Sequence, residues 1–207
     1  MKTKHLFLII SLFFGSQIFA QDIQSSTSGF CVYGGASISG WSSESFFLGD
    51  LAELEPGGFG FKLGLGYGFN EKFSIHLQHY NSTFKKAFDW DTYSFSSETL
   101  SARFTFGATL SKWRPYLEAG LATARNKVDP ITIDNVGSFE LRNTGFGIHT
   151  GGGLNFHIGG SLAISAQANY IFGSFSDITI SGEIYDPEEN VDFGILHINF
   201  GIRYYLE

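Results

Sequence analysis

The strongest constraint on the fold is a period of two in the side chains of residues 196–206. Successive side chains of an extended strand point to opposite faces, so this period sorts them between the two sides of a sheet. One side would carry Leu196, Ile198, Phe200, Ile202, Tyr204 and Leu206. The other would carry His197, Asn199, Gly201, Arg203 and Tyr205. A wide apolar side opposite a small, polar or aromatic side is typical of a transmembrane β-strand.

The same alternation occurs in seven earlier segments. It is clearest between Phe59 and Phe69, where aromatic and leucine residues alternate with Lys62 and glycines. Glycine opposite bulky residues suits the crowded interior of a narrow barrel. The eight expected strands cover about residues 30–41, 57–69, 73–80, 100–110, 117–124, 146–156, 162–172 and 196–206.

The first 20 residues have the pattern of a secretory signal peptide. Lys2 and Lys4 precede an apolar run that ends at Phe14, and the small residue Ala20 would stand at the cleavage site. We therefore expect a signal peptide over 1–20 and a single domain over 21–207. Without the two lysines, the 13 basic residues become 11 against 20 acidic ones, and a net charge of −9 argues against a nucleic-acid partner. The single Cys31 excludes an internal disulfide.

After the signal peptide, no segment has the roughly 20 consecutive apolar residues that a spanning helix needs. Strands span lipid only as a closed barrel, because lipid cannot satisfy the amide groups of an open edge. The sequence therefore predicts an all-β fold, namely an eight-stranded antiparallel up-and-down transmembrane β-barrel. The competing interpretation is a soluble secreted barrel that uses its apolar face as a core and binds a lipophilic ligand.

Charge placement favours the membrane barrel. Within the eight segments the charged residues are Lys62, Arg103, Glu118 and Arg203, and all four share the glycine-rich phase. A water-facing surface of eight strands would carry many more charges. We expect these four inside the barrel, with Glu118 able to pair with Arg103, Lys62 or Arg203.

The expected connections alternate in length. Those after the second, fourth and sixth segments are short, and long ones cover about residues 42–56, 85–99, 125–144 and 173–192. Short turns on one side and long loops on the other are typical of outer-membrane barrels, with both termini periplasmic.

With these features, essentially all of the mature chain resembles the small eight-stranded outer-membrane barrels of the OmpX and OmpA-barrel type, including the outer-membrane β-barrel-domain proteins of Bacteroidetes. Members usually finish on an aromatic residue, and here the pair Tyr204-Tyr205 precedes Leu206-Glu207. The resemblance implies a monomer in the outer membrane of a Gram-negative cell, in contact with its lipid and without a cofactor or metal.

An eight-stranded barrel is filled by its own side chains, so a general diffusion pore is not expected. We predict that the interior polar residues form a hydrogen-bonded network that plugs the barrel, the alternative being a ligand or proton path. The proposed members are Lys62, His76, Tyr80, Arg103, Glu118, His149 and Arg203, and the interior phase also carries Gln167, Asn169 and Asn199.

One enzymatic alternative has a specific form. A family of lipid A deacylases consists of eight-stranded barrels with a lipid-facing His-x-Ser pair, and this chain offers His79-Tyr80-Asn81-Ser82. The match is incomplete, because Asn81 shares the face of His79 whereas Ser82 points the other way. A histidine beside an aromatic belt at the membrane surface is the simpler explanation of His79.

The long loops are acidic and contain hairpin-like stretches. In the last loop, oxygen-bearing side chains occur at alternate positions, namely Asp186, Glu188, Asn190 and Asp192. A hard cation such as calcium could bind to such a set of ligands. Residues 131–141 and 178–185 are expected to form hairpins that extend the sheet. We predict a non-enzymatic outer-membrane protein with a structural or adhesive role, whose loops contact an extracellular protein or glycan. A role as an accessory of an export machine stays open.

Overall fold

The computed structural model describes residues 27–43, 57–85, 91–107, 111–133, 137–185 and 191–206. All regular secondary structure in these ranges is β-strand, and no helix among them is long and apolar enough to cross a membrane. The strands are β1 (Gly29–Ser42), β2 (Gly57–Gly68), β3 (Phe73–Phe84), β4 (Thr92–Thr105), β5 (Trp113–Ile133), β6 (Gly137–His157), β7 (Leu162–Ile180), β8 (Glu183–Tyr185) and β9 (Val191–Tyr205).

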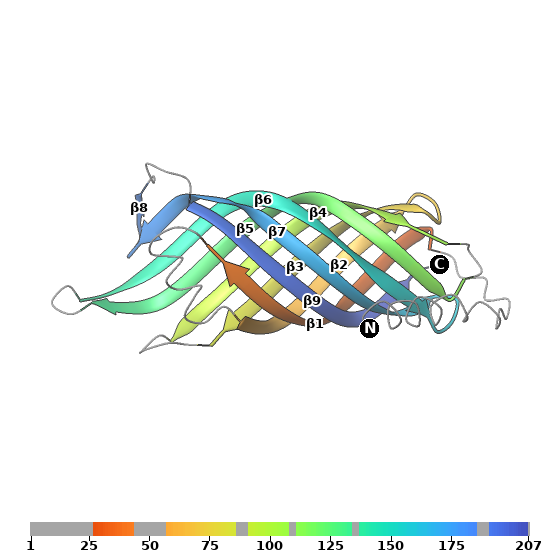
Figure 1. Cartoon of the computed structure of the whole chain (residues 1–207), viewed down its shortest axis with the longest axis horizontal. Coiled ribbons are helices and arrows are strands. Elements are labelled where there is room, and N and C mark those ends of the chain that lie inside the picture. The colour runs from red at the N-terminus through yellow and green to blue at the C-terminus, as the bar shows by residue number, and fades with distance from the viewer. Residues whose placement is uncertain are drawn as a thin grey trace, which may run out of the picture.

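The sheet closes on itself. Each strand from β1 to β7 pairs antiparallel with the next, and β9 closes the ring by pairing with both β7 and β1. The short strand β8 pairs with the outer end of β7 and lies outside this ring. Eight strands therefore form the wall, as Figure 1 shows, and the prediction of an eight-stranded up-and-down barrel is confirmed.

Strand alternation places the apolar side chains on the outside of the wall. Every wall strand contributes exposed aromatic or aliphatic residues, for example Phe30, Leu63, Leu77, Leu100, Leu121, Phe146, Ile164 and Ile198. In a soluble secreted barrel these apolar side chains would form the core. In the closed sheet they lie on the outer surface instead. A band of apolar side chains around a closed barrel is the surface that lipid requires.

Several strands are longer than expected. The predicted loops at 85–99, 125–144 and 173–192 are largely strand, since β4 begins at Thr92, β5 and β6 continue to Ile133 and from Gly137, and β7 continues to Ile180. These extensions carry polar residues on their outer face, so the apolar alternation that marks the membrane-spanning parts is lost there. The fourth expected strand, 100–110, ends earlier, at Thr105, and residues 108–110 lie outside the described ranges.

Both expected hairpins are present in the described residues. In the first, Ile131 of β5 pairs with Phe139 of β6, and in the second, Ile178 of β7 pairs with Tyr185 of β8. In Figure 1 the β5–β6 hairpin projects furthest to the left, on the side opposite the short connections between β2 and β3 and between β6 and β7. We call these two sides the extended end and the short-turn end.

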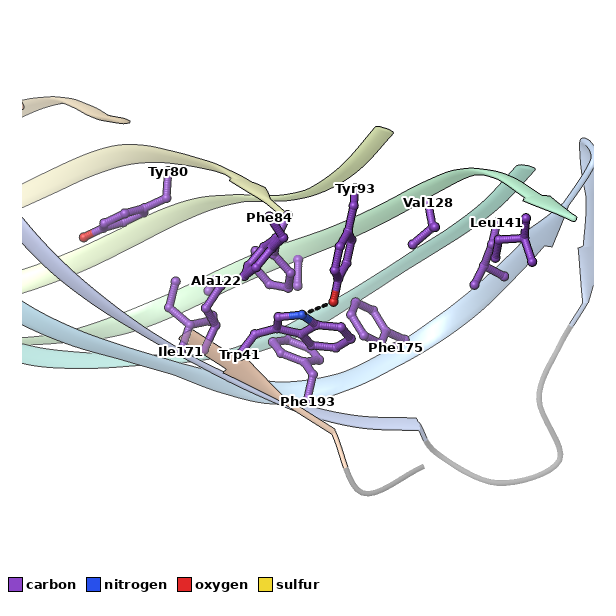
Figure 2. Packing of buried hydrophobic residues seen from close by; sticks show 14 residues of the cluster. Trp41, Tyr80, Phe84, Tyr93, Ala122, Val128, Leu141, Ile171, Phe175 and Phe193 are labelled. Carbon is purple, nitrogen blue, oxygen red and sulfur yellow. Dashed lines mark hydrogen bonds between the residues drawn. The ribbon is translucent and has the colours of Figure 1, made fainter. Parts of the chain in front are cut away.

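The interior at the extended end is filled by apolar side chains. This aromatic cluster contains Trp41, Phe84, Tyr93, Phe95, Phe175 and Phe193, packed with Val128, Ile131, Leu141, Ile171 and Ile195. Figure 2 shows these side chains converging from strands on opposite sides of the barrel, with the Trp41 indole nitrogen donating a hydrogen bond to the Tyr93 hydroxyl. Phe175 and Phe193 pack with ring centroids 4.6 Å apart. The cluster was not predicted, and it closes the interior at this end.

Candidate functional site in the barrel interior

The polar interior lies between the aromatic cluster and the short-turn end. Its charged residues come from four strands, with Lys62 on β2, Arg103 on β4, Glu118 on β5 and Arg203 on β9. All four are at most 4% exposed. Their positions follow from the period of two, since each occupies the inward phase of its strand.

Glycines on β2 make room for the large interior side chains. A Cβ atom at Gly64 would lie 2.4 Å from the Tyr33 ring, and one at Gly66 would lie 2.4 Å from Nδ1 of His76. Any larger residue at these two positions would displace a ring. The glycine-rich phase of β2 is therefore the wall against which the interior rings pack.

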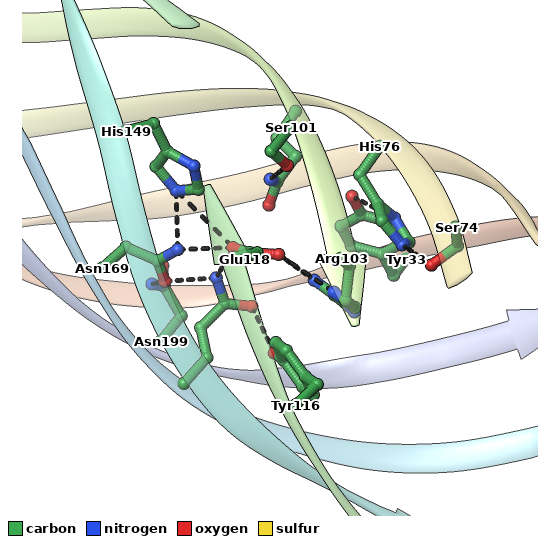
Figure 3. Close-up of polar contacts among 12 residues, drawn as sticks. Tyr33, Ser74, His76, Ser101, Arg103, Tyr116, Glu118, His149, Asn169 and Asn199 are labelled. Carbon is green, nitrogen blue, oxygen red and sulfur yellow. Dashed lines mark hydrogen bonds and ion pairs between the residues drawn. The ribbon is translucent and has the colours of Figure 1, made fainter. Parts of the chain in front are cut away.

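Glu118 is the centre of the network shown in Figure 3. Its Oε2 accepts hydrogen bonds from Arg103 Nε at 2.9 Å and from Arg103 Nη2 at 2.5 Å. Its Oε1 accepts from Asn169 Nδ2 at 2.5 Å and from Gln167 Nε2 at 3.2 Å, and His149 Nε2 lies 3.5 Å away. Of the three partners that the sequence left open, the carboxylate pairs with Arg103. Multiple donors are what a carboxylate buried in a barrel needs.

Lys62 reaches the network through a neutral side chain. Its ammonium group donates to Oε1 of Gln167, which also accepts from the Tyr116 hydroxyl at 2.9 Å. The same ammonium lies 5.1 Å from the centre of the Tyr33 ring and 5.4 Å from that of Tyr80. Aromatic faces thus supply part of the electrostatic stabilisation of this buried cation.

Arg203 has no carboxylate partner among the described residues. Its guanidinium lies over the Tyr33 ring, 4.0 Å from the ring centre, and its Nη1 is 3.3 Å from the sulfur of Cys31. The Arg103 guanidinium lies in the same way over Tyr116, at 3.8 Å. The two arginines therefore differ, because only Arg103 has a counter-charge.

The interior histidines are held by hydroxyl groups and rings. Nδ1 of His76 is hydrogen-bonded to the Tyr33 hydroxyl at 3.1 Å, and its Nε2 to Ser74 Oγ at 2.8 Å. His197 stacks on Tyr80 with ring centroids 4.8 Å apart. All seven residues proposed for the network are buried, and contacts within it join Arg103, Glu118 and His149 directly.

Tyr33 and Tyr116 were not predicted as members of the site, whereas Gln167 and Asn169 were placed on the interior phase. Both tyrosines share the inward phase of their strands, so the period of two was the available signal. Their importance depends on which strands face one another across the barrel, and this period does not contain that information.

A second polar group closes the short-turn end. The carboxylate of Glu71, in the turn between β2 and β3, accepts from the Thr27 backbone amide at 3.0 Å, from its hydroxyl at 2.6 Å and from Arg114 Nη1 at 2.9 Å. Partial burial acts to raise the pKa of Glu71, but the hydrogen bonds from Thr27 and Arg114 outweigh it and hold this pKa below its usual range. These three residues, which we call the Thr27 latch, fix the chain just before β1 to the barrel.

Two other predicted sites lie away from the interior. His79 faces outward, 3.4 Å from Glu98, whereas Ser82 is fully buried and hydrogen-bonded to Ser39 inside the barrel. Of the proposed cation ligands Asp186, Glu188, Asn190 and Asp192, only the last falls in the described ranges. Within those ranges no group of three or more acidic, histidine or cysteine side chains is arranged to hold a metal ion.

The sequence profile of the outer membrane protein beta-barrel domain family matches residues 6–204. The match covers nearly the whole chain, so the chain belongs to this family. Together with the closed barrel and its apolar outer band, this defines a barrel of the Gram-negative outer membrane, in contact with lipid. No curated protein matches the chain significantly.

Solved structures of small outer-membrane barrels share the fold. Neisserial surface protein A is 23% identical, with a TM-score of 0.60 over 86% of this chain and 98% of its own. OprG of Pseudomonas aeruginosa is 16% identical, with a TM-score of 0.58 over 89% and 100%. Ail, the attachment invasion locus protein of Yersinia pestis, is 16% identical, with a TM-score of 0.51 over 86% and 100%.

Proposed function

We propose that this chain is a non-enzymatic outer-membrane protein that binds an extracellular protein through the sheet at its extended end. The observation that carries the proposal is the strand β8, which adds to the outer end of β7 beyond the barrel wall. In the described part of the chain its other edge is unpaired. In this proposal the short-turn end is periplasmic and the extended end faces the exterior.

The exposed edge fits strand addition. An unpaired edge offers a row of amide and carbonyl groups to an extended segment of another protein, and alternate side chains give specificity. On β8, Ile184 is 73% exposed and Tyr185 is 49% exposed. Apolar and aromatic side chains at an open edge outside the lipid suit a protein partner.

The filled interior supports a surface role. The aromatic cluster occupies the extended end and the Glu118 network occupies the middle, so side chains fill the space that a transported solute would need. Eight-stranded barrels are narrow enough for side chains to leave no continuous channel. Ail, a barrel that matches 86% of this chain, is named for attachment and invasion.

The experiment compares cells that display the wild-type barrel with cells that display the double variant Ile184→Lys, Tyr185→Lys, on a panel of immobilised extracellular proteins. Ser176→Lys is the control, because Ser176 is exposed and lies on β7, not on the edge strand β8. We expect binding above vector-only cells for the wild type and the control, and a loss of about tenfold or more for the edge variant. Equal binding by the edge variant, or no binding by the wild type, contradicts the proposal.

The outer wall also supports a non-enzymatic role. On the outer wall, His79 has a carboxylate partner in Glu98. The nearby hydroxyl of Thr123 donates its hydrogen bond to Glu98, at 2.5 Å, and not to His79. A base activates a nucleophile only when the two are in hydrogen-bond contact. The His79 ring instead packs near Phe61, with centroids 6.0 Å apart, as expected for a histidine beside an aromatic belt.

Mass spectrometry of lipid A after incubation with the purified barrel tests this part separately. We expect no release of acyl chains. Release by the wild type that is lost in His79→Ala would show the deacylase activity and overturn the non-enzymatic assignment.

A further inference from the structure

The short-turn half of the barrel contains a small internal cavity beside the Glu118 network. Its wall includes Arg103, Arg203, His76, Ser74, Asn155 and Tyr205. The cavity volume is about 10 Å³, which is room for one small particle. Thr27 and Glu71 of the Thr27 latch line its outer side.

Two arginines that line this cavity carry unused donors. Nη1 of Arg103 and Nε of Arg203 are buried and have no hydrogen-bond partner among the described residues. Both side chains are 2% exposed. A buried donor without a partner is strongly unfavourable, and more so on a charged group, so a group that accepts from both would relieve both.

The charge balance identifies the kind of acceptor. In the described interior, Lys62, Arg103, Arg203 and Arg114 are cationic, and the carboxylates are those of Glu118 and Glu71. Four positive groups face two negative ones, an excess of two. Glu118 forms an ion pair with Arg103, and Glu71 forms one with Arg114. The Arg203 guanidinium contacts only the Tyr33 ring and the Cys31 sulfur among the described residues. A water molecule would accept hydrogen bonds but would not compensate this charge.

We propose that the cavity binds a monatomic halide ion, with Nη1 of Arg103 and Nε of Arg203 as its ligands. The volume excludes larger anions such as phosphate or a carboxylate. The ion supplies the negative charge that Arg203 lacks and enters as the barrel folds, before the Thr27 latch closes over it.

Bromide gives a direct test, because its anomalous X-ray scattering distinguishes it from water. The full mature chain is refolded and crystallised in sodium bromide, and anomalous differences are measured at the bromine edge. We expect one peak between Arg103 and Arg203. A crystal whose cavity holds a water molecule, or nothing, with no anomalous signal overturns the proposal.

A solution measurement covers the case in which a variant does not crystallise. The urea unfolding equilibrium is followed in bromide and in gluconate at equal ionic strength. With bromide at about tenfold above its Kd, mass action shifts the wild-type equilibrium about tenfold towards the folded state. Arg203→Met should lose this halide dependence, whereas Arg142→Met, which removes an exposed arginine at the extended end, should keep it. Equal behaviour of the wild type in the two salts contradicts the site.

Discussion

The two halves of the barrel interior are filled by different kinds of interaction. The extended end is packed by rings and aliphatic side chains, such as Phe175 against Phe193. The middle and the short-turn end are filled by directional contacts, of which the Arg103–Glu118 ion pair is the strongest. Apolar packing depends on volume and tolerates changes that preserve it, whereas a buried charge requires each of its partners. The halves should therefore respond differently to substitutions of similar size.

The largest expected effect comes from removing the central carboxylate. Glu118→Ala leaves the Arg103 guanidinium buried without a counter-charge and removes one acceptor from the amide groups of Gln167 and Asn169. Breaking a buried pair in this way costs about 3–5 kcal/mol. Urea unfolding of the folded barrel in lipid vesicles measures the loss, and the heat-modifiable gel band reports whether the barrel forms.

The control for this prediction is Glu140→Ala. Glu140 lies on the extension of β6, and its ion pairs with Lys127 and Arg142 involve partly exposed side chains. Such pairs are worth about 0–1 kcal/mol. Equal losses in the two variants would show that the polar half is no more dependent on its charges than the outer surface is.

A volume-preserving change in the aromatic cluster should have a smaller effect. Ile195→Leu conserves the volume of an apolar side chain within the cluster, and swaps of this kind cost less than about 1.5 kcal/mol. Its unfolding free energy is measured in the same vesicles. A loss as large as that of Glu118→Ala would remove the distinction between the halves.

The strand pattern was predictable because lipid imposes one requirement on every membrane-spanning strand, an apolar outer face. Beyond the lipid this requirement ends, and the outward residues of the extensions, such as Lys127 and Arg142, are polar. The sequence indicated the hairpin at residues 131–141, but it did not reveal that β5 and β6 run without a break from the barrel wall into that hairpin. Phe193 was missed for the same reason, since it precedes the apolar alternation that begins at Leu196.

The interior site was predictable in part. The period of two placed Glu118 on the inward face, where the structure also has it. This period does not specify which residues lie opposite Glu118 across the barrel. Asn169 and Gln167 come from β7, which is not a neighbour of β5 in the sheet. Contacts across a barrel depend on strand tilt and register, and the alternation of side chains along a single strand contains neither.

Polar residues within the apolar half give a further contrast. Asn126 and Asn143 face each other across β5 and β6, fully buried, and their amide atoms have no hydrogen-bond partners among the described residues. Replacing both by leucine, which has a similar shape, removes unsatisfied groups from an apolar environment. We expect a gain of about 1 kcal/mol in the free energy of unfolding. A loss of stability in this double variant would indicate that the two amides have a polar partner.

The smallest expected effect concerns the Thr27 latch and depends on pH. The pKa of Glu71 is lower in the folded barrel than in the unfolded chain, so its ionised form stabilises the fold. This contribution is complete above the ordinary pKa of a glutamate, near 4.5, and is lost as the pH falls through the lower pKa of the folded state. Glu71 is partly exposed, so the contribution is below about 1 kcal/mol.

Glu71→Gln tests this dependence, because glutamine keeps the shape of the side chain and removes its charge. Near neutral pH the variant should unfold at a slightly lower urea concentration than the wild type. The two curves should converge as the pH falls below the lowered pKa of Glu71 in the folded barrel, where the protonated glutamate of the wild type resembles glutamine. A gap that is the same at every pH would mean that the latch acts through its hydrogen bonds alone, and the short-turn end would then differ from the centre of the polar half, where charge is decisive.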